Sequence, residues 1–314
     1  MKRVVVLGGS GFVGRALCQR LFEHDAGLRI VVPTRRNAHG DSVRALPTVD
    51  IVVADIHDPG ALARVLADAD AVVNLVAILH GSRGDFEHVH VRLPQHIVQA
   101  CRQARLRRVV HVSALGVGPG VQSDYLKSKT AGEAVWASSG LDVTLLRPSV
   151  IFGVNDRFLN LFASLQTLAP VVPLAGSGAR LQPVWVQDVA EAVLRCLLRT
   201  DTIGKTYECA GPKAFTLSEI VRLAGRWAGV ERPQIALPDG AATLQAALME
   251  LLPGPPLLSR DNLRSLATPN VATPGAPGLA ALGITPAAME AVAPAFLADL
   301  HGRPRLDRWR ASRG

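Results

Sequence analysis

The sequence predicts an α/β protein in which a doubly wound parallel sheet carries a small C-terminal α/β lobe. In the first half of the chain, short apolar runs typical of buried strands alternate with longer runs of helical periodicity. The first apolar run, Val4–Leu7, leads through a glycine-rich turn into a helix. The 314 residues, 48% hydrophobic and 19% charged, suffice for a substantial core. We expect the sheet domain over residues 1–155, its sheet completed by 180–200, and the lobe mostly over 156–314.

The first turn carries three glycines, Gly8, Gly11 and Gly14, spaced three residues apart. In such a turn the first glycine allows the tight bend, the second lets a pyrophosphate approach the backbone, and the third lets the helix pack closely on the strand. The phosphates would then lie at a helix N-terminus, where backbone N–H groups favour anions. This pattern predicts an NAD(P)-binding Rossmann domain. The residues expected to contact the cofactor in this turn are Gly8, Ser10, Gly11, Phe12, Val13 and Gly14.

A second apolar strand, Leu28–Pro33, is followed by Arg35 and Arg36, about twenty residues beyond the last glycine. This position selects the cofactor, because an Asp or Glu here holds the ribose 2′-hydroxyl of NAD. Two arginines can instead bind a 2′-phosphate. We therefore favour NADP(H) over NAD(H). The alternative is that Arg35 and Arg36 begin a solvated loop, since residues 37–41 are turn-like.

The third and fourth strands, Val49–Ala54 and Ala71–Val76, each end at a candidate cofactor contact. Asp55 and Ile56 follow the third strand. Asp55 is placed to accept a hydrogen bond from the adenine amino group, and the alternative is that its carboxylate only caps the loop. Ala77 follows the fourth strand, where its small side chain would let the backbone pass close to the cofactor.

The fifth strand, Arg108–Ser113, is followed by a glycine-containing loop and then by Tyr125 and Lys129. These residues are four apart and lie on one face of a helix, where the lysine ammonium would lower the pKa of the phenol. A tyrosine tuned in this way exchanges a proton with a substrate while hydride moves to or from nicotinamide. Lys129 would also hold the nicotinamide ribose. We expect both residues to be catalytic and to contact the cofactor.

The sixth strand, Asp142–Leu146, runs into Pro148, which we expect to end the pairing and turn the chain over the nicotinamide end. Pro148 and Ile151 complete the expected cofactor contacts.

The order of these motifs resembles the extended or atypical short-chain dehydrogenases/reductases. The motifs are Gly8-x-x-Gly11-x-x-Gly14, Tyr125-x-x-x-Lys129, Leu146-Arg147-Pro148 and Val186-x-Asp188-Val189-Ala190. The resemblance covers nearly the whole chain. It implies the strand order three-two-one-four-five-six and places substrate specificity in the second half.

A narrower set of segments resembles the nucleotide-binding accessory subunit of respiratory complex I and its bacterial relatives. The segments are Val32–Arg36, His111–Gly116, Tyr125–Lys129, Ile151–Gly153, Asp156–Asn160 and Gln182–Val184. This resemblance implies a firmly held NADPH that is structural, with complex I as the partner. The alternative is an NADP-dependent oxidoreductase or nucleotide-sugar epimerase/dehydratase that uses Tyr125 as acid and base.

Ser113 is the third candidate catalytic residue. Sugar-nucleotide epimerases and dehydratases usually carry a further serine or threonine just after the first serine that ends strand five, but this chain has Ala114 and Leu115 there. Ser113 alone must therefore polarise a substrate, or it is a strand-end serine whose hydroxyl bonds to the backbone.

In the second half, the periodicity predicts a helix over Asp156–Leu168, a helix capped by Asp188 and a capping box formed by Thr216 and Glu219. We expect a further apolar helix over 241–252. Either it contacts a membrane or a hydrophobic partner, or it packs within the lobe. For the arginine-rich tail, 303–313, two interpretations stay open. It binds an acidic partner or lipid headgroups, or it is a solvated terminus.

The net charge of +8 suits an anionic ligand or an acidic or membrane-surface partner. Except near the C-terminus the arginines are dispersed, so we expect no nucleic-acid binding. The four scattered cysteines are typical of reduced core thiols in a cytoplasmic protein, with the inner face of the membrane as the alternative location. No metal-ligand spacing is present, and neither a secretory signal nor a transmembrane segment is expected.

Overall fold

The computed structural model describes residues 1–251, 254 and 256–298, and the chain divides into two compact units. The arginine-rich tail at 303–313 and the last residue of the helix expected over 241–252 lie outside these residues. The first unit comprises 1–148, 186–209 and 272–285; the second comprises 149–185, 210–271 and the described part of 286–314.

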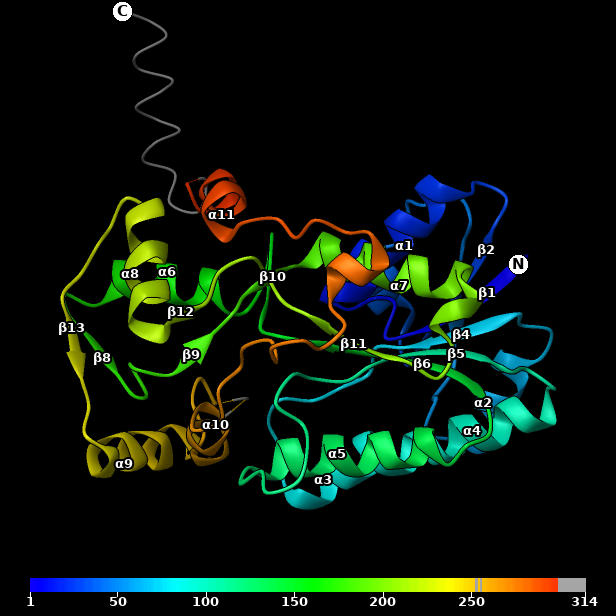
Figure 1. The fold of residues 1–314 in the computed structure, drawn as a ribbon, viewed down its shortest axis with the longest axis horizontal. Helices are drawn as coiled ribbons and strands as arrows, with labels where there is room; N and C mark the ends of the chain where they lie inside the picture. The colour runs from blue at the N-terminus through cyan, green and yellow to red at the C-terminus, as the bar shows by residue number, and fades with distance from the viewer. Residues whose placement is uncertain (252–253, 255, 299–314) are drawn as a thin grey trace, which may run out of the picture. The chain divides into compact units, whose positions relative to one another are not determined.

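The first unit is built on a seven-stranded parallel sheet with the order β11-β6-β5-β4-β1-β2-β3 (Figure 1). Its strands are β1 (Arg3–Leu7), β2 (Arg29–Thr34), β3 (Val49–Val53), β4 (Ala71–Asn74), β5 (Arg108–Val112), β6 (Asp142–Pro148) and β11 (Thr206–Cys209). The central strand β1 pairs Val4 with Ile30 of β2 and Val5 with Val72 of β4. The implied order of the first six strands is confirmed.

The sheet is completed by β11 and not by residues 180–200. Residues 186–198 carry buried side chains at helical spacing, among them Val189, Val193 and Cys196, and they form a helix that packs on α1. The strand that joins the sheet follows this helix and pairs Thr206 with Leu145 of β6. Pro148 also corrects an expectation, because it remains within β6: its carbonyl oxygen accepts the Leu115 N–H at 2.8 Å, and proline lacks only the donor.

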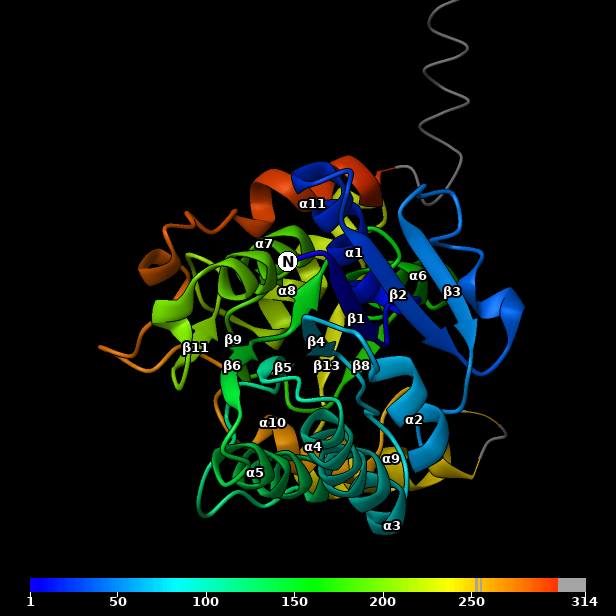
Figure 2. The ribbon, with the colours of Figure 1, turned by 90° about the vertical axis from the view of Figure 1, so that its right-hand side faces the viewer.

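Helices cover both faces of the sheet, as Figure 2 shows, with α1 and α7 on one face and α2, α4 and α5 on the other. The α-helices of this unit are α1 (Phe12–His24), α2 (Pro59–Leu66), α3 (Arg83–Glu87), α4 (Leu93–Gln103), α5 (Asp124–Ala137) and α7 (Val186–Leu198). Its short helical turns are η1 (Asn37–Gly40), η2 (His88–Arg92), η3 (Thr200–Thr202) and η4 (Leu279–Leu282). Apolar side chains between the sheet and α2, α4 and α5 form one continuous core.

The second unit packs α6 (Leu159–Leu168), α8 (Leu217–Trp227) and α11 (Met289–Leu297) around a core that includes Phe152 and Phe215. Its remaining elements are α9 (Asp239–Glu250), α10 (Arg260–Leu266), β7 (Ile151–Phe152), β8 (Val172–Leu174), β9 (Arg180–Leu181), β10 (Val184–Trp185), β12 (Phe215–Thr216) and β13 (Gln234–Ala236). The strands pair in twos, as β10-β7, β12-β9 and β13-β8.

Three local expectations have different outcomes in these elements. The capping box of α8 is confirmed, because Thr216 Oγ1 accepts the Glu219 N–H at 3.2 Å and Glu219 Oε2 accepts the Thr216 N–H at 2.7 Å. The helix expected over Asp156–Leu168 begins later, at Leu159, so Asp156 precedes α6. Its carboxylate accepts the Gly153 and Phe158 N–H groups in the loop before the helix. Helix α7 begins at Val186, so Asp188 lies in its first turn and not at its cap.

Helix α9 packs within the second unit through alanine. Ala242 and Ala246 are buried, whereas Leu244 and Leu248 are 62% and 57% exposed. The expectation of an apolar helix is therefore met, but its leucines lie outside the core. No helix in the described ranges is long and apolar enough to cross a bilayer.

Candidate functional site

The turn after β1 has the geometry that its glycines predict. Gly8 has a φ of +83°, and the Gly11 N–H donates to its carbonyl at 3.0 Å. A Cβ on Gly14 would lie 2.3 Å from the Gly8 carbonyl oxygen, so helix α1 packs directly on the turn. Gly9, which the sequence reasoning did not single out, is also constrained, because its Cβ would lie 2.7 Å from Val32. No side chain caps α1, and its first turn contains no acidic residue.

The end of β2 presents two cations. Thr34 is buried, and its hydroxyl donates to the Arg36 carbonyl at 2.9 Å, which shapes the chain as it leaves the strand. Arg35 and Arg36 are exposed, and neither forms an ion pair with another described residue. The pKa of His57 is lowered mainly by burial of its ring and next by the charge of His88. The charge of Arg35 lowers it further.

The loops after β3 and β4 are held by short polar contacts. Asp55 Oδ1 accepts the His57 N–H at 3.0 Å, so the loop-capping interaction is present, and contact with adenine stays a prediction. The buried Asn74 accepts the Val76 N–H at 3.1 Å and thereby shapes the chain before Ala77, which is exposed. Sequence reasoning missed Asn74, although an amide at the end of an apolar strand is an available indicator.

Tyr125 and Lys129 lie on α5, whose N-cap Ser123 accepts the Leu126 N–H at 3.1 Å. Lys129 is only 2% exposed, and its ammonium donates to the Val112 carbonyl at 3.0 Å. Burial lowers the pKa of Lys129 to about 8, against the opposing charge of Glu133. Glu133 in turn forms a bidentate ion pair with Arg147, in which Arg147 Nε lies 2.9 Å from Glu133 Oε1.

The expected activation of Tyr125 is not present. Burial raises the pKa of the Tyr125 phenol to about 12, opposite to the lowering that a nearby ammonium would cause. The reason is that loss of water disfavours the phenolate, while the Lys129 ammonium donates to the strand carbonyl of Val112. In this state Tyr125 is a neutral phenol at physiological pH.

Ser113 lies at the end of β5 and is 5% exposed. Its hydroxyl is buried and has no hydrogen-bond partner among the described residues, so the backbone-bonded alternative is not what the structure contains. A buried hydroxyl without a partner costs free energy unless a ligand or water satisfies it. Ser113 therefore remains available to a bound molecule.

One edge of the parallel sheet gathers the predicted residues of the first unit. Because all seven strands are parallel, their carboxyl ends meet there, and the turns that follow them carry the candidate positions. These are Gly8–Gly14 after β1, Arg35 and Arg36 after β2, Asp55 and Ile56 after β3, Ala77 after β4, Ser113 after β5 and Pro148 at the end of β6. Ile151 belongs to β7 of the second unit, where it pairs with Val184.

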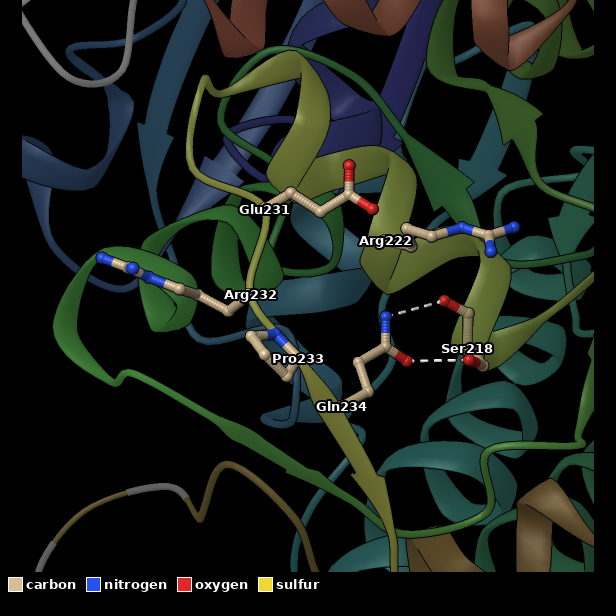
Figure 3. Close-up of a pocket in the computed structure, with 6 residues that line it drawn as sticks. All are labelled: Ser218, Arg222, Glu231, Arg232, Pro233 and Gln234. Carbon is tan, nitrogen blue, oxygen red and sulfur yellow. Dashed lines mark hydrogen bonds between the residues drawn. The ribbon is translucent and has the colours of Figure 1, made fainter.

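A separate pocket of about 460 Å³ lies in the second unit, beside α8 and β13. Ser218 and Gln234 bind each other across it through two hydrogen bonds of 2.8 and 3.1 Å (Figure 3). The side chains of Arg222 and Arg232 point in opposite directions, so its polar groups do not converge on a ligand (Figure 3). Within the described ranges, no group of histidine, cysteine and acidic residues could hold a metal ion. The sheet edge is therefore the candidate site.

The seven-stranded parallel sheet, with helices on both faces and a glycine-rich turn after β1, is the Rossmann fold in which nicotinamide dinucleotides bind at the carboxyl edge of the sheet. Residues 4–210 match the family model described as the NAD dependent epimerase/dehydratase family. The chain belongs to that family, which confirms the resemblance to extended short-chain dehydrogenases/reductases.

Curated relatives confirm the narrower resemblance as well. The chain is 29% identical over 314 residues to NADH dehydrogenase (ubiquinone) 1 alpha subcomplex subunit 9, mitochondrial, of Mus musculus, covering 98% of this chain and 81% of that protein. It is 27% identical over 286 residues to the NADH-ubiquinone oxidoreductase 40 kDa subunit, mitochondrial, of Neurospora crassa, covering 90% and 75%.

Solved structures with the same fold include enzymes. DesIV, a dTDP-glucose 4,6-dehydratase from Streptomyces venezuelae with NAD and TYD bound, is 25% identical with a TM-score of 0.65, covering 76% of this chain and 85% of that one. The structure of gox2253 is 20% identical with a TM-score of 0.71, covering 98% and 99%, and supports the fold alone.

Proposed function

We propose that this chain binds NADP(H) at the carboxyl edge of the sheet and holds it as a structural cofactor of a respiratory NADH:quinone oxidoreductase accessory protein. The observation that carries the NADP(H) preference is the end of β2, where two exposed arginines stand and no carboxylate follows the strand. The close glycine turn fits a bound dinucleotide, as does the Ser113 hydroxyl, which has no hydrogen-bond partner in the part of the chain that the structure describes. The bound cofactor would supply hydride-transfer capacity.

Each part of the edge has a binding role in this proposal. The turn from Gly8 to Gly14 would hold the pyrophosphate, Arg35 and Arg36 the 2′-phosphate, and Asp55 with Ile56 the adenine. Ala77 would let the chain pass beside the cofactor, and Pro148 would border its nicotinamide end. Lys129 gives one hydrogen bond to Val112, which leaves ammonium donors for ribose hydroxyls beside Tyr125.

Replacing both Arg35 and Arg36 by alanine tests the cofactor preference. Each charge-assisted contact to phosphate is worth about 1.5–3 kcal/mol, so the loss of both is expected to weaken NADPH binding by about 100-fold or more. NADH lacks the 2′-phosphate, and its affinity should change by less than about twofold. Titration calorimetry with both nucleotides measures this. Arg64→Ala, on an exposed position of α2, is the control. Equal weakening of both nucleotides, or a wild type that prefers NADH, would contradict the preference.

Native fractionation of gently solubilised host membranes tests the partner. We expect this chain and NADPH to co-migrate with subunits of the respiratory NADH:quinone oxidoreductase at the inner face of the membrane, as mass spectrometry would detect. This rests on the names of the relatives, which are subunits of NADH dehydrogenase. Recovery of the chain only as a free protein would reject the accessory role.

The second candidate is an NADP-dependent oxidoreductase or nucleotide-sugar epimerase/dehydratase. It is favoured by the buried hydroxyl of Ser113, to which no described residue is hydrogen-bonded. In that reaction Ser113 would donate a hydrogen bond to a substrate oxygen, and Tyr125 would exchange the proton. A screen of carbonyl, quinone and nucleotide-sugar substrates tests it. Tyr125→Phe should abolish turnover and retain the cofactor if this enzyme reading holds.

A further inference from the structure

His90 occupies an unusual turn beside the candidate site. It lies in η2, a single π-helical turn between α3 and α4, and it is 3% exposed. π-helical turns insert an extra residue into a helix and are frequent at functional sites. Gly132 of α5 makes room for this turn, because a Cβ there would lie 2.1 Å from the His90 carbonyl oxygen. Helix α5, which carries Tyr125 and Lys129, therefore packs backbone against backbone on the turn.

Both ring nitrogens of His90 are hydrogen-bonded, and each bond reaches a different part of the site. The Ile78 N–H, in the loop that follows β4, donates to Nε2 at 3.2 Å. Ser128 Oγ donates its proton to the Tyr125 carbonyl at 2.7 Å, so at 2.8 Å it accepts the proton on His90 Nδ1. His90 is thus neutral with its proton on Nδ1. Burial and the charge of Lys129 agree with this, since they lower the pKa of His90 to about 3.

The imidazole ring also fixes an aromatic group. Its edge-on contact with the Tyr125 ring has a centroid separation of 5.6 Å and an interplanar angle of 81°. The imidazole ring also stacks on the Phe86 ring, with a centroid separation of 5.7 Å and an interplanar angle of 20°. The Phe86 ring in turn contacts the Tyr125 ring at a centroid separation of 6.0 Å. The position of the phenol therefore depends on the same side chain that holds Ile78.

We propose that His90 is a positioning residue that connects the Ala77–Ile78 loop to the helix bearing Tyr125 and Lys129, and so holds the half of the site that receives nicotinamide. The inference rests on the proposed dinucleotide site and deepens it. His90 acts here through its two hydrogen bonds and not as a metal ligand.

His90→Phe tests this role, because phenylalanine keeps a ring against Phe86 and Tyr125 but removes both hydrogen bonds. We expect the Kd for NADPH to rise about tenfold, while the Kd for 2′,5′-ADP, which has no nicotinamide half, changes less than about twofold. Ser128→Ala removes the Nδ1 acceptor, together with the hydroxyl's own bond to the Tyr125 carbonyl, and should weaken NADPH binding about threefold. Ser138→Ala is the matched control, since that exposed serine bonds only to carbonyls at the end of the same helix.

The order of measurements separates this inference from the proposed function. The wild type is titrated first with NADPH and with 2′,5′-ADP. If it binds neither of them, the dinucleotide site itself is rejected. If the wild type binds both, unchanged NADPH affinity in His90→Phe overturns the positioning role. Equal weakening of both nucleotides also overturns it, because that result indicates a general loss of folded structure. Should His90→Phe not fold, Ser128→Ala gives the same comparison without altering a ring.

Discussion

Replacing Gly14 by alanine is expected to lower the free energy of unfolding by about 3 kcal/mol and to abolish measurable NADPH binding. The added Cβ would lie 2.3 Å from the Gly8 carbonyl oxygen and 2.5 Å from Gly9 Cα. Both are backbone atoms and cannot rotate away, so α1 must move off the turn that is proposed to hold the pyrophosphate. Urea denaturation and calorimetric titration of the same preparation measure the two effects.

Gly60→Ala is the matched control for this substitution. Gly60 lies in the first turn of α2, and its Cβ would meet only side-chain atoms, at 3.4 Å and beyond. Alanine in a helix with room for it should leave stability unchanged or raise it by about 0.5–1 kcal/mol. Gly11→Ala is intermediate, with one backbone contact at 3.1 Å. A Gly14 variant as stable as Gly60→Ala would show that the close packing of helix on turn is not required.

Local patterns were sufficient to predict most of the first unit. Segments such as Val4–Leu7 and Ala71–Val73 are continuous apolar runs, and buried parallel strands have this composition because both faces are covered. The seventh strand escaped this reasoning. Thr206–Cys209 alternates buried and half-buried residues at the sheet edge, so it lacks the uniform apolar run of the central strands.

The chemistry of the site was less accessible to the sequence. The spacing of Tyr125 and Lys129 places them on one helix face, but it does not say where the ammonium points. The carbonyl of Val112, which accepts from Lys129, comes from another element, and the desolvation that raises the pKa of Tyr125 depends on the whole core. His90 was missed for the same reason, since its partners Ile78 and Ser128 are distant in the chain.

Lys129→Met should remove a pH dependence of stability that the buried ammonium imposes. Burial lowers the pKa of Lys129 from 10.5 in the unfolded chain to about 8 in the folded protein. Between these values the unfolded chain binds more protons at this residue, so the wild type gains stability as pH rises. Below pH 8 the full cost of the buried charge is present, about 3 kcal/mol for a shift of this size. The methionine variant carries no such cost.

The measurement is the difference in free energy of unfolding between wild type and Lys129→Met from pH 7 to 10.5. It should change by about 3 kcal/mol in favour of the wild type across that range, because Tyr125 and the buried cysteines are common to both proteins and cancel. Lys127→Met, on an exposed position of the same helix, should give a difference that varies by less than about 0.5 kcal/mol. A flat difference for Lys129→Met would mean that the ammonium is not desolvated.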